Sequence, residues 1–398
     1  MEYKQLLCDL FLAYYDARRN KRKTINAIAF EVDYESNLIQ LAQDIWERKY
    51  VPKRSICFIN FKPVQREIFA ADFRDRIVHH LIFRYLNPIV EPGFIKDSYS
   101  CRKGKGTHYG IRRVHSFIRG CSNNYTKDAW ILKIDILGYF MSIDRQILFD
   151  DIYRKVSNFN GENHLFKELL LYLVEQTIFI DPTQHCIVKG DASDWKGLPR
   201  SKSLFGAPKG KGFPIGNLSS QLFSNIYLNS FDHFVKEQLS IKYYGRYVDD
   251  SVLVHSDKDF LKGLILQMET FLYTKLKLKL HPKKIYFQHY KNGVSFLGAY
   301  LKPHRIYTGK RTKRNFYESI EKWNTTIKDN RQKLSKNLLA QFMACINSYL
   351  GTLQHFNTYR LRKRMIWRLH PAFFNYVYVS GGYSKLVLKV KPIKYPIY

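Results

Sequence analysis

The chain has few cysteines, few acidic residues and no long hydrophobic run. Its six cysteines among 398 residues are scattered, with neither metal-ligand spacing nor the density of a disulfide framework. This usage is typical of a reducing compartment. No stretch approaches the roughly 18 apolar residues of a membrane-spanning helix. Asp9 interrupts the short apolar stretch at the amino terminus, which lacks a signal-peptide pattern. The sequence therefore predicts a cytoplasmic protein without a membrane contact.

The shortage of acidic residues leaves the chain strongly basic. It contains 65 Lys and Arg against 34 Asp and Glu, a formal net charge of +31. A charge of this size indicates a polyanionic partner. Aromatic residues make up 16% of the chain, and rings interleaved with cations suit single-stranded nucleic acid. Such a charge can also serve solubility or attract a chain to anionic membranes, but no basic amphipathic helix favours a membrane.

The order of elements predicts an α+β chain without repeats or low-complexity linkers. A basic helical extension is expected at 1–50, a basic α/β region at 51–127, a core at 128–302 with an insertion at about 157–214, and a basic helical tail at 303–398. Expected strands lie at 130–136, 242–248, 251–255, 285–289 and 294–301, and expected helices at 144–156, 160–180, 218–238 and 258–275. This alternation favours helices packed around one sheet.

An adjacent pair of aspartates, Asp249 and Asp250, lies between two short β runs in KYYGRYVDDSVLVHS. Two carboxylates held side by side repel each other unless a cation neutralises them. Arginines could supply that cation, and oxygen ligands on a β-turn also suit Mg²⁺. Asp135 lies near the end of an apolar strand in LKIDILGYF, where a lone buried carboxylate would be costly, although strand-end aspartates are common turn residues. Side by side in a sheet, these carboxylates could hold two divalent ions about 4 Å apart.

Seven segments resemble the motifs of reverse transcriptases, in the same order. LKIDILGYF resembles the first palm motif, FPIGNLSSQLFSNIYLN the second and YVDD the third. VQREIFAADFRDRIVHHLI and SYSCRKGKGTH resemble finger motifs, and LKLHPKKI and GVSFLGAYL resemble the last palm motif and the primer-grip hairpin. The resemblance implies a right-hand polymerase with fingers at 51–127, an RRM-like antiparallel-sheet palm at 128–302 and an α-helical thumb after 303.

The resemblance also implies a reaction and a metal site. The enzyme would be an RNA-directed DNA polymerase that makes cDNA by two-metal nucleotidyl transfer. Asp135 and Asp249 would bind both Mg²⁺ ions, with Mn²⁺ as a substitute, Ile136 would belong to the metal site, and Asp250 would complete the cluster.

Further residues are implied to bind the nucleotide. Arg66, Arg102 and Lys105 would grip the triphosphate, and Arg suits bidentate phosphate contact. Phe140 would pack beneath the sugar and exclude a 2′-hydroxyl; a core aromatic is the alternative. Lys284 would assist the pyrophosphate leaving group, with Lys283 nearly as plausible. Ile215, Gly216 and Gln221 complete the nucleotide-binding set.

The second motif separates subfamilies. Most reverse transcriptases have Gln-Gly-x-x-x-Ser-Pro, whereas this chain has Ile215-Gly216-Asn217-Leu218-Ser219-Ser220-Gln221. This pattern, with SYLGTLQHFNTYRLRKRM in the tail, resembles diversity-generating retroelement enzymes, which copy a template RNA with frequent errors at adenines. Ile215 offers no donor or acceptor, and losing a directional contact lowers discrimination by about 1–2 kcal/mol. Alternatively, Ile215 is a packing residue at a helix entry and fidelity is set elsewhere.

Other lineages and partners stay open. A retron, intron-derived or phage-defence reverse transcriptase is one alternative within the bacterial superfamily, and a non-catalytic RNA-binding protein on a polymerase scaffold is another. The expected partners are template RNA, the RNA/cDNA duplex, dNTPs and a small basic accessory protein that is oligomeric in its family. The resemblance implies a bacterial or phage-encoded protein of the cytoplasm.

Overall fold

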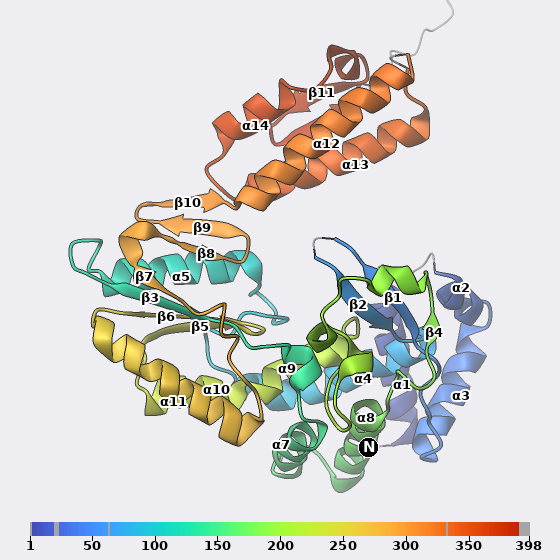
Figure 1. Ribbon diagram of the computed structural model, residues 1–398. Helices are drawn as coiled ribbons and strands as arrows, with labels where there is room; N and C mark the ends of the chain where they lie inside the picture. Colours follow the sequence, from blue (N-terminus) through green and yellow to red (C-terminus); the bar gives the residue numbers. More distant parts are fainter. Residues whose placement is uncertain (1, 20–23, 63, 332, 390–398) are drawn as a thin grey trace, which may run out of the picture. The chain divides into compact units, whose positions relative to one another are not determined.

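The computed structural model describes residues 2–19, 24–62, 64–331 and 333–389, and the chain divides into two compact units (Figure 1). Unit 1 comprises Met1–Gly106 and Leu132–Phe287, and unit 2 comprises Thr107–Ile131 and Gln288–Tyr398. Helices and sheets occur in both units, which confirms the predicted α+β class. None of the helices in the described ranges combines the length and hydrophobicity that a membrane crossing requires.

A four-stranded sheet carries the predicted carboxylates. Its strand order is β5-β6-β3-β7, with bounds Tyr243–Tyr247 for β5, Asp250–His255 for β6, Trp130–Ile134 for β3 and Tyr286–His289 for β7. The division between the two units falls within β3 and β7. β5 and β6 form an antiparallel hairpin in which Tyr247 pairs with Asp250. The apolar, β-branched interior of β6 is buried, as expected for a strand covered on its faces.

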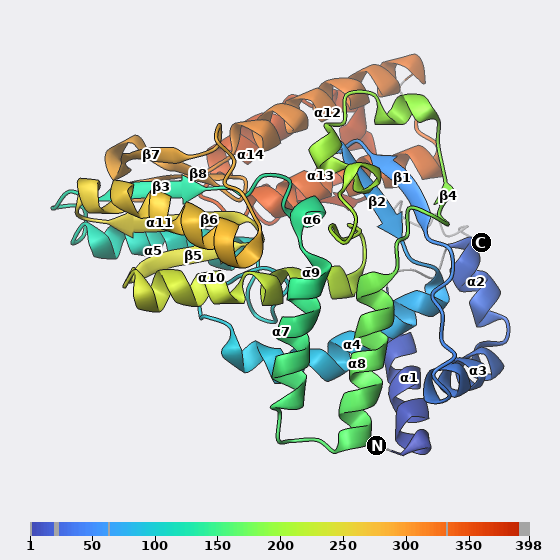
Figure 2. The same cartoon turned by 60° about the horizontal axis from the view of Figure 1, so that its bottom comes forward.

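Further helices of unit 1 lie between β3 and β5 and after β6 in the chain. α9 (Leu218–Tyr227) and α10 (Asn229–His233) are followed by a π-helical turn at Phe234–Gln238, so the predicted helix at 218–238 is three consecutive segments. α11 (Lys258–Leu276) packs against β6. α7 (Arg145–Ser157) and α8 (His164–Phe179) lie side by side (Figure 2). Asp144 and Asn163 cap these two helices by accepting backbone hydrogen bonds, which explains where each helix begins.

The first part of unit 1 is a helical layer beside a small sheet. Its helices are α1 (Tyr3–Arg18), α2 (Ile25–Glu31), α3 (Tyr34–Trp46) and α4 (Phe73–Val90). α4 packs against α1 and α9. The sheet has the order β2-β1-β4, with β1 at Ile56–Asn60, β2 at Arg66–Ala70 and β4 at Ile187–Val188.

A buried glutamate anchors the insertion of unit 1 to this sheet. Glu67 of β2 is fully buried. It accepts hydrogen bonds from Trp195 Nε1 at 2.7 Å, Ser203 Oγ at 2.8 Å and Leu204 N at 2.6 Å. These three hydrogen bonds satisfy the acceptor groups of the buried carboxylate. Sequence reasoning missed this anchor, because Glu67 lies about 130 positions from its partners.

Unit 2 contains a three-stranded antiparallel sheet and a helical bundle (Figure 1). The sheet order is β10-β9-β8, with β8 at Val294–Phe296, β9 at Ala299–Lys302 and β10 at Arg305–Thr308. The predicted single strand at 294–301 is wrong, because Leu297 and Gly298 both have positive φ and form a turn that splits it.

Unit 2 has four α-helices in the described ranges. They are α5 (Thr107–Cys121), α12 (Lys310–Asp329), α13 (Lys336–Leu353) and α14 (Tyr359–Ile366). α12, α13 and α14 share one core, whereas α5 packs against β9. α12 and α13 lie side by side, and Phe342 of α13 stacks on Phe373 with ring centroids 4.0 Å apart. A hairpin of β11 (Val377–Ser380) and β12 (Lys385–Leu388) follows. The sequence predicted a mostly helical tail and did not predict this hairpin.

Candidate active site

The sheet of unit 1 brings the three predicted aspartates together. Asp135 directly follows β3, and Asp249 and Asp250 lie at the β5–β6 turn. β3 and β6 are neighbours in the sheet. Burial raises the pKa of Asp249 to about 6, and the negative charges of Asp135 and Asp250 contribute to this rise. Burial also raises the pKa of Asp250, where Lys133 opposes the shift and Asp135 adds to it. Such mutual repulsion is expected of carboxylates that share one site.

Two lysines neutralise part of this charge. Lys284 Nζ lies 3.0 Å from both side-chain oxygens of Asp135. Lys133 Nζ lies 3.0 Å from Asp250 Oδ1. The Lys133 contact is an ion pair, and the buried Asp250 Oδ1 accepts no other hydrogen bond from the described residues. Asp250 Oδ1 therefore retains acceptor capacity, whereas both oxygens of Asp135 contact Lys284.

The carboxylates do not form a finished metal site. Within the described ranges, no group of three or more His, Cys, Asp or Glu side chains is arranged to hold a metal ion. The donor chemistry nevertheless fits Mg²⁺, because carboxylate oxygens are its preferred protein ligands. Ile136, the remaining predicted member of the site, pairs with Leu280 in an isolated antiparallel bridge. The binding of Mg²⁺ or Mn²⁺ at these residues stays a prediction.

Phe140 and Ile215 lie in one apolar cluster. Both are partly buried against a small core made of Cys57, Phe69, Met141 and Leu204. The Ile215 carbonyl accepts a hydrogen bond from Phe69 N at 2.9 Å. Gly216 has φ +131°, and a Cβ there would lie 3.0 Å from Ile68 Cγ2 and 3.1 Å from the Phe69 carbonyl. The packing explanation for Ile215 thus has direct support, while its contact with a nucleotide stays a prediction.

The remaining predicted nucleotide-binding residues lie elsewhere in unit 1. Arg66 is the first residue of β2, pairs with Asn60 of β1 and is exposed. Gln221 Oε1 accepts a hydrogen bond from Cys101 Sγ at 2.7 Å. Arg102 has a buried guanidinium, which donates to Glu91 Oε1 at 2.7 Å and to two backbone carbonyls. Lys105 Nζ donates to the Lys96 carbonyl at 2.8 Å. None of these contacts joins them to the aspartates, and their nucleotide-binding roles stay predictions.

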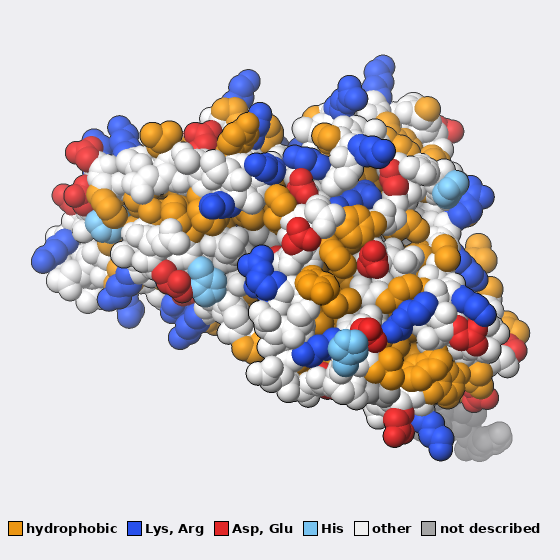
Figure 3. Space-filling view, turned by 90° about the horizontal axis from the view of Figure 1, so that it is seen from below, with side chains coloured by type: hydrophobic (Ala, Val, Ile, Leu, Met, Phe, Trp, Pro, Cys, Tyr) orange, Lys and Arg blue, Asp and Glu red, His pale blue; other side chains and the backbone are white. Residues whose placement is uncertain are grey.

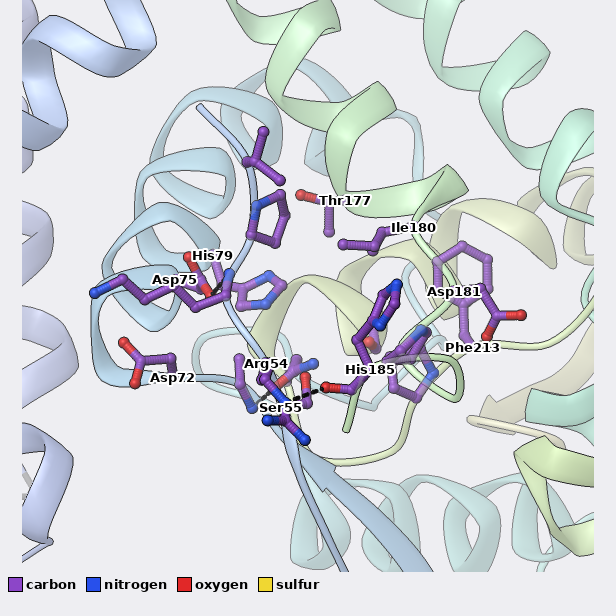
Figure 4. A pocket seen from close by; sticks show the side chains of 18 of the residues that line it. Arg54, Ser55, Asp72, Asp75, His79, Thr177, Ile180, Asp181, His185 and Phe213 are labelled. Carbon is purple, nitrogen blue, oxygen red and sulfur yellow. Dashed lines mark hydrogen bonds between the residues drawn. The ribbon is translucent and has the colours of Figure 1, made fainter. Parts of the chain in front are cut away.

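A separate cavity of about 930 Å³ lies in unit 1 (Figure 4). Its walls come from the segments at 50–55, 71–79, 177–187 and 213–220. Asp75 and His79 project from α4 into the part shown in Figure 4. Tyr50 Oη donates to Asp75 Oδ1 at 2.9 Å, and Lys53 N donates to Asp75 Oδ2 at 2.7 Å. The three aspartates of the candidate site do not line this cavity.

The surface charge is mixed on the face that Figure 3 shows. Lysine and arginine side chains are spread among hydrophobic and acidic side chains there. The high net charge of +31 is therefore not gathered into one patch on this face.

A sheet that gathers three carboxylates at one end has the arrangement predicted for a polymerase palm. Residues 51–301 match the model of the family described as "Reverse transcriptase (RNA-dependent DNA polymerase)". The match covers more than half of the chain, and the protein belongs to this family. Family membership confirms the predicted right-hand polymerase fold class, whereas the boundaries of fingers, palm and thumb stay predictions.

Curated relatives include two bacterial proteins. Protein YkfC of Escherichia coli K12 is 27% identical over 292 residues, which cover 64% of this chain and 66% of that protein. Group II intron-encoded protein LtrA of Lactococcus lactis is 21% identical over 384 residues, covering 78% of this chain and 58% of that protein. The chain thus spans less than two thirds of the length of these relatives.

Among solved structures, the apo telomerase of Candida tropicalis is similar with a TM-score of 0.48 and 12% identity, covering 82% of this chain and 63% of that chain. A Candida albicans telomerase with a fragment of telomeric RNA is similar with a TM-score of 0.47 and 12% identity, covering 86% of this chain and 59% of that chain.

Proposed function

We propose that the protein is an RNA-directed DNA polymerase that extends a primer with dNTPs on a template RNA. The supporting observation is the convergence of Asp135 with Asp249 and Asp250 at adjacent strands, in a chain of the reverse transcriptase family. Asp135 and Asp249 would hold two Mg²⁺ ions, and Asp250 would complete their charge. When bound there, Mg²⁺ lowers the pKa of a primer 3′-hydroxyl and stabilises charge on the transferring phosphoryl group.

The residues of this chain have separate tasks in that reaction. The three carboxylates would orient the reacting oxygens, and Lys133 would hold Asp250 in place through its ion pair. Lys284 contacts both oxygens of Asp135. Its ammonium would assist the leaving pyrophosphate. Phe140 would contact the sugar, and Arg66 the triphosphate.

Primer extension on an RNA template tests this proposal. Asp135→Ala and Asp249→Ala should each abolish extension while RNA binding stays intact, because the basic surface is unchanged. Asp329→Ala removes an exposed aspartate at the end of α12 and serves as the matched control, which should extend normally. Full activity of either site variant would refute the assignment. Absence of cDNA from the unaltered protein with any primer, metal or accessory protein would favour a non-catalytic RNA-binding protein.

The finer proposal is that synthesis is error-prone at adenines and serves sequence diversification. Its support is the segment from Ile215 to Gln221, where Ile replaces the Gln of most reverse transcriptases. The name of the Lactococcus relative, an intron-encoded protein, favours an intron-derived enzyme as the alternative. Sequencing of cDNA products separates these lineages: excess substitutions at template adenines support diversification, and faithful copies oppose it.

The partners and place of action belong to the same proposal. The net charge of +31 supports binding of template RNA and of the RNA/cDNA duplex. A small basic accessory protein and a bacterial cytoplasm follow from the retroelement resemblance. Copurification with and without ribonuclease treatment would show whether such a protein binds directly or through RNA.

A further inference from the structure

A buried ion pair lies behind the turn that carries Asp249 and Asp250. Arg246 of β5 and Asp232 of α10 both have fully buried side chains. Arg246 Nη2 lies 2.6 Å from Asp232 Oδ2, and Nε lies 2.7 Å from Oδ1. Tyr244 Oη donates to the same Oδ1 at 2.7 Å. The bidentate geometry fixes the guanidinium plane in one orientation.

The same guanidinium also holds the turn itself. Arg246 Nη1 donates to the Val248 carbonyl at 2.8 Å. Val248 has φ +56°, a left-handed conformation that is strained for a β-branched residue and is retained only where surrounding contacts impose it. Because Val248 directly precedes Asp249, the position of its carbonyl constrains the peptide that leads to both carboxylates.

Arg246 is held on its other side by the segment at 97–99. Arg246 N donates to the Asp97 carbonyl at 2.9 Å, and Tyr99 N donates to the Arg246 carbonyl at 2.9 Å. Nη2 also lies 3.4 Å from Ser98 Oγ. Gly245 allows this close approach, because a Cβ there would collide with the Tyr99 hydroxyl. Arg246 therefore links α10, the segment at 97–99 and the carboxylate turn.

Stability alone does not account for this arrangement. Removing two charges from water is costly, and well-packed apolar replacements of buried ion pairs are often neutral or stabilising. An apolar side chain cannot, however, donate to the Val248 carbonyl. The hydrogen bond from Arg246 to the Val248 carbonyl is therefore the contact that apolar packing could not replace.

We propose that Arg246 is a positioning residue that, held by Asp232, sets the turn at Val248 and thereby places Asp249 and Asp250 relative to Asp135. This inference rests on the proposed polymerase function. Arg246 acts through the backbone and touches neither substrate nor metal.

Replacement of the whole polar set tests this inference. The triple variant Asp232→Leu, Tyr244→Phe, Arg246→Met removes both charges and the buried hydroxyl together, so that no buried charge is left unpaired. Tyr244→Phe alone removes one hydrogen bond to Asp232 and leaves the turn contact, which makes it the matched control. Arg246→Lys is a second single variant. It retains the charge but lacks the planar guanidinium that contacts Asp232, the Val248 carbonyl and Ser98 Oγ together.

Four measurements are made on each full-length protein: the urea midpoint, the dissociation constant for primer–template, the single-turnover extension rate against Mg²⁺ concentration, and Mn²⁺ binding by the protein alone. The triple variant should keep a urea midpoint and a primer–template affinity near those of the unaltered protein. Its extension rate should fall by about 100-fold, the scale of a misplaced catalytic group. Half-maximal rate should need several-fold more Mg²⁺, and Mn²⁺ should bind more weakly. Arg246→Lys should show the same change in rate, Mg²⁺ dependence and Mn²⁺ affinity, and Tyr244→Phe should match the unaltered protein in these three readouts.

A folded triple variant or Arg246→Lys variant with an unchanged rate, Mg²⁺ dependence and Mn²⁺ affinity would overturn the inference and leave the ion pair as a packing feature. If the triple variant does not fold, Arg246→Lys decides by the same readouts. Failure of the unaltered protein to extend any primer would instead refute the proposed function, so the two failures are distinct.

Discussion

Lys284 Nζ lies 3.0 Å from both side-chain oxygens of Asp135, although 149 positions separate the two residues in the chain. The lysine follows the segment that pairs with Ile136 and brings an ammonium group to the carboxylate. The lysine is half-exposed, with 49% of its side chain accessible, so the ammonium can exchange the carboxylate for another anion. This contact supports the proposal that Lys284 assists the leaving pyrophosphate.

Lys284→Ala should lower the primer-extension rate by roughly 100-fold at saturating dNTP, the lower end of what a positioned proton donor contributes. Lys283 is exposed and lies one position away, so Lys283→Ala is the matched control and should change the rate little. Single-turnover kinetics with each variant measures the difference. Equal rates for both variants would remove Lys284 from the reaction.

Ile215→Gln should reduce misincorporation opposite template adenines by about tenfold, because a side-chain amide restores a directional contact worth about 1–2 kcal/mol. Ile215→Val keeps an apolar side chain in the same cluster and should leave the error frequency unchanged. Sequencing of cDNA made on one template by both variants measures this effect. An unchanged error spectrum in Ile215→Gln would support the packing explanation.

Glu67→Ala should destabilise unit 1 by about 3 kcal/mol, because it leaves donors on Trp195, Ser203 and Leu204 without their buried acceptor. Trp195→Phe removes only one of these contacts and should cost less. Urea denaturation gives both values, and limited proteolysis should show cleavage in the insertion of Glu67→Ala first. Equal stability of Glu67→Ala and the unaltered protein would contradict the anchoring role.

Acid should destabilise the protein partly through His79. Burial lowers the pKa of His79 from 6.5 to about 3, and the charges of His80 and Arg76 add to this. Between these values the unfolded chain binds more protons than the folded one, so the free energy of unfolding falls as the pH decreases from about 6.5. His79→Gln should therefore lose less stability than the unaltered protein between pH 7 and pH 4.5, as measured by urea midpoints.

Asp75, on the same helix, should change the pH dependence of stability in the opposite direction. Burial raises its pKa from 3.8 to about 6, despite hydrogen bonds from Tyr50 and Lys53 that lower it. Its folded form binds more protons between these values, so this group contributes stability as the pH falls from about 6. In Asp75→Asn, the free energy of unfolding should therefore fall more steeply below about pH 6 than in the unaltered protein. If stability falls with decreasing pH as steeply in both variants as in the unaltered protein, neither group carries the pH dependence.

The sequence predicted those features that follow from local patterns. The hairpin around Asp249, the strand before Asp135 and the helix at 258–275 were recognisable because apolar periodicity and turn residues act over short distances. The family match over residues 51–301 confirms that the motifs belong to a reverse transcriptase.

Long-range polar contacts were not predictable from the sequence. Glu67 and Arg246 look like surface charges in the chain, and only the fold shows that their side chains are buried and paired. Arg102 was assigned to the triphosphate from its motif, whereas its guanidinium is engaged by Glu91 and local carbonyls. The β11–β12 hairpin was missed because its strands are short and follow a basic helical stretch.

The most direct test is cDNA synthesis on a defined RNA template by the unaltered protein and by Asp249→Asn, with RNA binding measured in parallel. Asn keeps the shape of the side chain and removes the charge that the carboxylate cluster requires. We expect primer extension by the unaltered protein, none by Asp249→Asn, and equal RNA affinity for both. Extension by Asp249→Asn at the rate of the unaltered protein would show that the Asp249 carboxylate is not required for catalysis.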